Sequence, residues 1–177
     1  MAYSGINKST SYFNSKLYTG TTNAQSITGV GFQPDWCWIK RRNGTASHEA
    51  YDAVRGTGKV IYPDASDAQV THGTSYFNSF DSDGFSFLGG NSGLNGNSDT
   101  YAAWNWKAGT GAGSSNTDGT INTTYTSVNT TAGFSISQYE GTGSNATFGH
   151  GLGVAPKMVI VKRGQAASRI TNLNLSA

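Results

Sequence analysis

The chain has 177 residues and a formal net charge of +2, from 12 basic and 10 acidic side chains. Charged residues are only 12% of the chain and apolar residues 36%, a composition that excludes a highly charged disordered protein and a coiled coil. The basic residues are too scattered for a phosphate-rich partner, and no apolar run approaches the roughly 20 residues of a membrane-spanning helix, so we expect neither nucleic-acid binding nor membrane insertion.

Short aromatic-rich runs, separated by Gly, Pro, Asn and Asp, predict many strands and no long helix. In chain order, the expected strands span residues 12–18, 35–40, 48–55, 59–62, 74–80, 85–88, 100–107, 119–128, 134–139 and 157–162. Asn43-Gly44 suits a type I′ hairpin turn, and residues 109–117 (GTGAGSSNT) have the composition of a flexible linker. The pattern predicts an all-β fold, an antiparallel β-sandwich that is jelly-roll-like.

One phrase occurs twice. GVGFQPDWCWIKRR at 29–42 returns as GLGVAPKMVIVKRG at 151–164, a constant offset of 122 residues. Upstream, FNSKLY at 13–18 parallels FSISQY at 134–139 with one residue of slip. We therefore expect a β-sandwich unit at 1–133, a partial second repeat of two strands at 134–163, and a tail at 164–177.

A two-stranded hairpin is at most marginally stable alone, so the second repeat is expected to add its hairpin to a larger body. Its strand MVIVK, at 158–162, is apolar without alternation, which predicts burial on both faces. We expect the first unit or a neighbouring subunit to cover this strand, because an exposed apolar edge promotes aggregation.

Two W-x-W pairs are the candidate binding residues: Trp36 with Trp38, and Trp104 with Trp106. Alternate residues of a strand share a face, so each pair places a large aromatic surface on one side of a sheet. Rings that interdigitate in the sandwich core are the expected arrangement. The alternative is a platform on which sugar rings stack.

Nothing in the sequence argues for catalysis, and we expect no cofactor and no metal. The DSDG turn at 81–84 has the Asp-x-Asp-Gly form of a calcium loop, but the twelfth position of that loop is Ser92 where a Glu is needed. Glu49 and Asp52 are the nearest approach to an acid–base pair, and a solvated strand face explains them. The basic cluster Lys40-Arg41-Arg42 is interpreted as a solvated strand end. Cys37 is the single cysteine, which excludes an intrachain disulfide.

Several phrases together resemble a recurrent β-rich domain of bacteriophage structural proteins, found in tail fibres of phages of marine and cyanobacterial hosts. The phrases are GVGFQPDWCWIKRRN, YDAVRG, FNSFDSDGFSF, TYAAWNWKAG, TAGFSISQYEGTG and GHGLGVAPKMVIVK. The resemblance implies a non-enzymatic virion protein made in the host cytoplasm, either a tail fibre or a fibre-like attachment protein. Its implied partners are other virion proteins and copies of itself, with a trimer natural for fibres. A capsid decoration protein and a module that binds a host surface glycan are the alternatives.

Overall fold

The computed structural model describes residues 8–165, which form short strands and two single-turn 3-10 helices. In chain order these elements are η1 (Ser9–Ser11), β1 (Phe13–Thr19), β2 (Gln25–Ile27), β3 (Trp36–Arg41), β4 (Glu49–Asp52), β5 (Lys59–Val60), β6 (Val70–Thr71), η2 (Gly73–Ser75), β7 (Phe77–Asp81), β8 (Gly84–Phe87), β9 (Thr100–Trp106), β10 (Thr123–Asn129) and β11 (Phe134–Tyr139). The described part of the chain contains no helix long and apolar enough to cross a bilayer.

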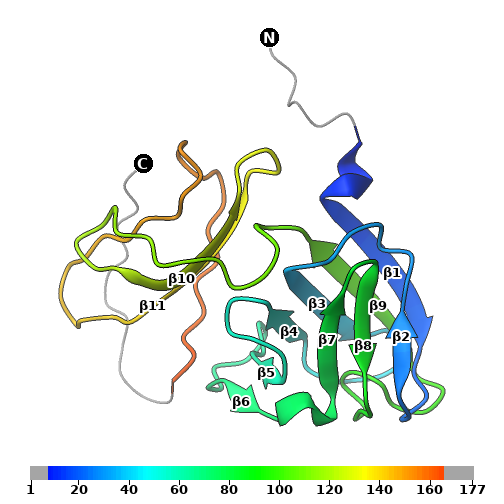
Figure 1. Cartoon of the computed structure of the whole chain (residues 1–177). Helices are drawn as coiled ribbons and strands as arrows, with labels where there is room; N and C mark the ends of the chain where they lie inside the picture. The colour runs from blue at the N-terminus through cyan, green and yellow to red at the C-terminus, as the bar shows by residue number, and fades with distance from the viewer. Residues whose placement is uncertain (1–7, 166–177) are drawn as a thin grey trace.

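Two antiparallel sheets face each other in the first unit. One has the strand order β1-β9-β3-β4 and the other β2-β8-β7, while β5 and β6 form a small ribbon beside them. β10 and β11 form a separate two-stranded sheet, which lies to one side of the two-layered body in Figure 1. The predicted all-β antiparallel sandwich is confirmed. Its jelly-roll-like connectivity stays a prediction.

The core lies between the two layers. The four-stranded sheet turns Cys37, Ile39, Tyr101 and Ala103 inward, all with 0% exposure. The facing sheet supplies phenylalanine rings, which stack on one another and on an aromatic ring of β4. The ring centroids of Tyr51 and Phe77 are 4.5 Å apart, and those of Phe77 and Phe85 5.6 Å. Offset aromatic pairs of this kind add to the stability gained from burying the rings.

Most expected strands of the first unit occur in the structure within a few residues of their predicted ends. The predicted strand at 48–55 shortens to Glu49–Asp52, and residues 53–55 turn away. The start of the strand predicted at 74–80 is the helix η2. β2 and β6 were not predicted, because three and two residues are too few to carry a period.

A buried carboxylate anchors the segment that leaves the sandwich. Asp35 is 0% exposed, and its carboxylate accepts hydrogen bonds from the amides of Ala108 (2.7 Å), Thr110 (3.1 Å) and Gly111 (2.7 Å). The expectation of a flexible linker at 109–117 is therefore wrong at its start. Composition allowed flexibility there, but a charged acceptor fixes the backbone.

The second repeat differs from the predicted hairpin of 134–139 with 157–162. β11 pairs instead with β10, which precedes it in the chain. The β10–β11 ribbon packs on the end of the first unit. The ring of Phe134 stacks on Trp106 with 6.1 Å between centroids, and Asn129 Nδ2 donates to the carbonyl of Ala108. The hairpin forms its own sheet and adds no strand to the sandwich.

The segment at 157–162 has no strand in the structure, so the expected strand is wrong, and the first unit does not bury its apolar side chains. Cover by a neighbouring subunit stays a prediction. Met158 is 76% exposed and Ile160 56%. Two polar contacts hold the end of the segment on the first unit. Lys162 Nζ donates to the carbonyl of Asp67 (2.5 Å), and the amide of Gln69 donates to the carbonyl of Gly164 (2.8 Å). High β-propensity does not make a strand when no neighbour completes its ladder.

Candidate functional site: the outer tryptophan face

The four tryptophans lie together on the outer face of the four-stranded sheet. β3 and β9 are antiparallel neighbours, and their register places Trp36 opposite Trp106 and Trp38 opposite Trp104. All four rings are half-buried, and none belongs to the core. The expectation that they interdigitate inside the sandwich is therefore wrong. The interior is already filled from the facing sheet by phenylalanines, opposite smaller side chains of β3 and β9.

Other side chains extend this outer face. The ring of Phe13, on β1, lies 4.8 Å from Trp106 between centroids, and Leu17 of the same strand is 64% exposed. At the other side of the sheet, Trp38 Nε1 donates a hydrogen bond to His48 Nδ1 (2.8 Å). The result is an apolar face on which contacts orient the indoles of Trp38 and Trp106.

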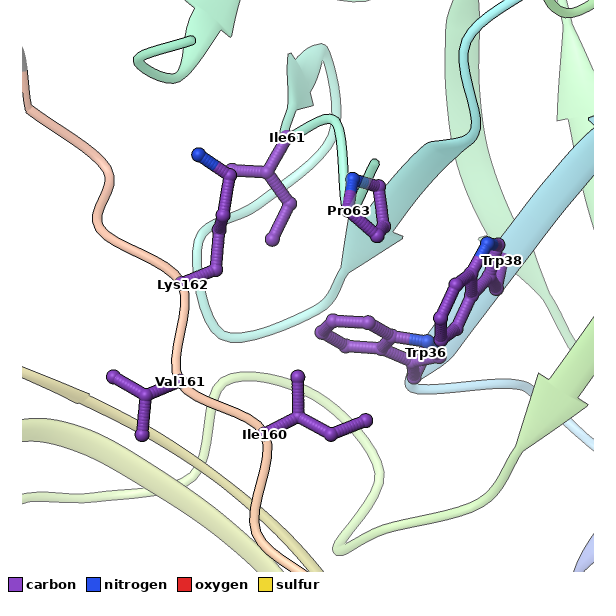
Figure 2. A pocket seen from close by; sticks show the side chains of 7 residues that line it. All are labelled: Trp36, Trp38, Ile61, Pro63, Ile160, Val161 and Lys162. Atoms are coloured by element: carbon purple, nitrogen blue, oxygen red, sulfur yellow. The ribbon is translucent and has the colours of Figure 1, made fainter. Parts of the chain in front are cut away.

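A cleft of about 110 Å³ opens beside two of the indoles, as Figure 2 shows. Its lining comes from the first unit and from the end of the second repeat: Trp36, Trp38, Ile61, Pro63, Ile160, Val161 and Lys162. The volume is well below the 300–1,000 Å³ or so of a typical small-molecule site. The walls carry no carboxylate or carboxamide. The cleft therefore fits an apolar side chain better than a hydroxyl-rich sugar.

The two carboxylates of β4 do not form an acid–base pair. Glu49 and Asp52 are three residues apart on a strand, so they point to opposite faces. Both are buried, so the expectation of a solvated strand face is wrong. Glu49 accepts a hydrogen bond from the Tyr51 hydroxyl (2.6 Å), and burial raises its pKa. Asp52 is ion-paired with Arg55 at 2.5 Å.

The DSDG turn at 81–84 stabilises the loop at residues 29–31 (GVG), here called the glycine loop. The carboxylate of Asp83 accepts hydrogen bonds from the amides of Gly29 (2.9 Å) and Gly31 (2.6 Å), which lower its pKa. Asp81 accepts a bond from the hydroxyl of Ser79 (2.6 Å). Because the amides of Gly29 and Gly31 hold the carboxylate of Asp83, the loop that contains these glycines has the geometry of an anion-binding nest, and the DSDG turn supplies its anion instead of forming a calcium loop. The described residues contain no cluster of three or more metal-ligating side chains.

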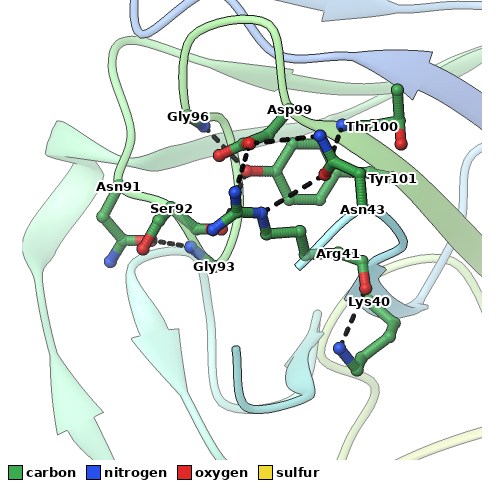
Figure 3. Close-up of polar contacts among 10 residues, drawn as sticks. All are labelled: Lys40, Arg41, Asn43, Asn91, Ser92, Gly93, Gly96, Asp99, Thr100 and Tyr101. Carbon is green, nitrogen blue, oxygen red and sulfur yellow. Dashed lines mark hydrogen bonds and ion pairs between the residues drawn. The ribbon is translucent and has the colours of Figure 1, made fainter. Parts of the chain in front are cut away.

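The basic cluster is partly used inside the fold, as Figure 3 shows. Arg41 Nη2 lies 2.5 Å from Asp99 Oδ1, and Asn43 accepts a bond from the amide of Thr100 (3.1 Å). These two contacts hold the end of β3 and the loop after it against the start of β9. The predicted type I′ turn at Asn43-Gly44 is wrong, because neither residue has the positive φ that this turn requires and β3 and β4 are joined by the longer loop 42–48. The basic cluster does lie at a strand end, as expected. Arg41 is not simply solvated there, because its ion pair with Asp99 stabilises the fold.

One family model matches residues 8–175, that of a domain of unknown function, DUF7483. The chain belongs to the DUF7483 family. Neither a curated protein nor a solved structure matches it. In this DUF7483 chain, the family match includes both repeats, so the half-formed second unit lies within the domain.

Two polar anchors of this chain were missed from the sequence: Asp35 at the exit of the sandwich, and Asp83, which lies in the β7–β8 turn and holds the loop of Gly29 and Gly31. Their donors lie 52 to 76 residues away. The one available signal was the repeated G-x-G of 29–31 and 151–153, which indicates a loop whose amides converge.

Proposed function

We propose that this chain is a non-enzymatic structural protein of a bacteriophage virion, a tail fibre or fibre-like attachment protein that acts through protein–protein assembly. The phrases quoted from the sequence support the phage setting by resemblance. Partners would be other virion proteins and further copies of the chain, and the location would be the virion.

One observation carries the assembly role. Apolar side chains of the second repeat are exposed together: Val154, Met158, Val159, Ile160 and Val161, at 40–76%. They continue into the cleft beside Trp36 and Trp38. Contiguous exposed apolar surface of this kind is typical of protein interaction sites.

The test is immunogold electron microscopy of intact virions, with antibodies raised against the purified chain. Gold on the tail or its fibres is the expected result. Gold spread over the shell would favour a capsid decoration protein over a tail fibre. Purified particles without any gold label would refute the virion proposal.

Glycan recognition is the second candidate, because the outer face presents half-exposed indoles on which sugar rings could stack. A glycan array tests it with the matched variants Trp104→Ala and Phe80→Ala, the first on the outer face and the second against the core. Binding lost only with Trp104→Ala would favour this candidate. Equal binding by all three proteins, or none, would remove it.

A further inference from the structure

The second repeat begins with the first half of a unit, and no second half lies within the described residues 8–165. In the first unit, residues 29–41 form the glycine loop and β3. That stretch is completed by β4 and β9, which flank β3, and by the β7–β8 turn, which closes the loop. The equivalent stretch is 151–163. Within residues 8–165, no strand pairs with it.

Core positions of the first unit remain apolar in the second, but none of them is fully buried there and three of the four are exposed. The first-unit positions and their exposures are Val30 (0%), Phe32 (4%), Cys37 (0%) and Ile39 (0%). Their equivalents, 122 residues later, are Leu152 (half-buried), Val154 (68%), Val159 (41%) and Val161 (40%). Four side chains with the chemistry of a core thus lack the layer that would bury them.

The glycine loop gives an independent indication. Gly29 and Gly31 have φ of 79° and 91°, and their amides hold the carboxylate of Asp83. Gly151 and Gly153 have φ of 72° and 71°, so the same left-handed conformation recurs. In the described part of the chain the amides of these two glycines have no acceptor. The loop is a preformed receptor for a carboxylate on a turn.

We propose that residues 151–163 are an acceptor site for an unpaired second half of a repeat, a segment with the chemistry of residues 76–107. That half-repeat carries an Asp-bearing β-turn like DSDG, followed by a strand like TYAAWNW. The strand pairs antiparallel with 158–163, and the Asp enters the G-x-G loop. The inference deepens the proposed assembly function by naming its partner chemistry, and it rests on that function for its biological setting.

A second copy of this chain fits the site less well. The second half at 49–107 is used by the first unit, so a copy would have to open its own sandwich to donate it. The donor is therefore a polypeptide whose half-repeat is unpaired. Backbone ladder bonds would supply affinity, and alternate side chains would supply specificity.

The probe is a fluorescein-labelled peptide of residues 76–107 of this chain, which contains β7, β8, β9 and Asp83. It is titrated into the full chain and followed by fluorescence anisotropy. We expect saturable binding of one peptide per chain. A peptide with Asp83→Asn should bind about tenfold more weakly, because a charge-assisted bond becomes a neutral one. Asp81→Asn is the matched control and should bind like the parent, since Asp81 bonds within its own hairpin.

Variants of the chain test the face that the strand presents. Val159 is equivalent to the buried Cys37, and Met158 to the outer Trp36. Val159→Asp should abolish binding, whereas Met158→Asp should leave most of it, although Met158 is the more exposed in the free chain. Gly153→Ala should weaken binding and Gly143→Ala should not. Both glycines have left-handed φ with open space around the added carbon, but only the first lies in the loop.

Three outcomes would overturn the inference. They are an unbound peptide, equal binding of a scrambled peptide, and equal losses for Val159→Asp and Met158→Asp, which would indicate unspecific adhesion. Sedimentation of the chain alone, and titration of a chain that ends at Gln165, distinguish other occupants. A homodimer that the peptide dissociates would assign the site to a second copy, and binding that requires the shorter chain would assign it to residues 166–177. Failure of peptide binding leaves the virion proposal standing, because immunogold labelling tests that separately.

Discussion

Asp35 offers a quantitative test of how the two parts of the chain are joined. Replacing it with alanine removes an acceptor from three amides, while its own backbone bonds to Trp106 and Ala53 survive. The Ala108 amide is fully buried and cannot reach water, so its loss should cost about 2–3 kcal/mol of the free energy of unfolding. The Thr110 and Gly111 amides are only partly buried, and each should cost about 1 kcal/mol after rehydration.

The expected total for Asp35→Ala is therefore about 4–5 kcal/mol. Asp35→Asn should cost only about 1–2 kcal/mol, because the amide oxygen can still accept from Ala108 and Thr110. Urea unfolding measures both values. Amide hydrogen exchange at residues 108–111 should be slowest in the wild type, faster in Asp35→Asn and fastest in Asp35→Ala.

Asp118→Ala is the control, because Asp118 is exposed and should change stability by no more than about 0.5 kcal/mol. An Asp35→Ala protein as stable as the control would show that the carboxylate does not hold the junction. Unchanged exchange at 108–111 would lead to the same conclusion.

Three further substitutions, with Gly73→Ala as the control for one of them, test the sandwich by urea unfolding. Burial raises the pKa of Glu49 above its usual 4.5, so its protonated form favours folding: this contribution is complete below pH 4.5 and is lost as the pH rises through the raised pKa. Glu49→Gln should flatten that dependence, and an unchanged pH profile would contradict it. Gly84→Ala should cost more than about 2 kcal/mol, because φ is 152° and the new carbon would also overlap the carbonyl oxygen of Ile27. Gly73→Ala, at φ 61° in open space, should cost only about 1–2 kcal/mol, and equal losses would refute the steric argument. Phe77→Ala should cost about 3–5 kcal/mol as a fully buried ring is deleted, and a loss below about 1 kcal/mol would contradict its place in the core.

Local sequence was sufficient for most strands of the first unit, because Gly, Pro, Asn and Asp mark their ends, but not for the very short β2 and β6. It also identified the two faces of β3 and β9 correctly. The side on which Trp36 and Trp106 lie was predicted wrongly, because alternation separates two faces without saying which one meets the second sheet. That choice depends on how much volume the facing phenylalanines fill.

In the second repeat, prediction of a strand from local sequence failed. Its sequence at 157–162 has every local property of a strand, and the equivalent residues of the first unit form one. A strand exists only when neighbours pair with it, and within the described residues the neighbours are missing. The similarity to β3 therefore indicates that the segment can form a strand when a neighbour pairs with it. It does not predict the conformation of the unpaired segment.

The position of Cys37 has a practical consequence. Its thiol is 0% exposed in the interior of the sandwich, burial raises its pKa, and the chain has no other thiol. A maleimide or disulfide reagent should reach the sulfur only when β3 and β9 separate from the phenylalanine layer. The rate of alkylation would therefore report the rate at which the first unit opens. No engineered probe is needed, and the second repeat contributes no signal because it has no cysteine.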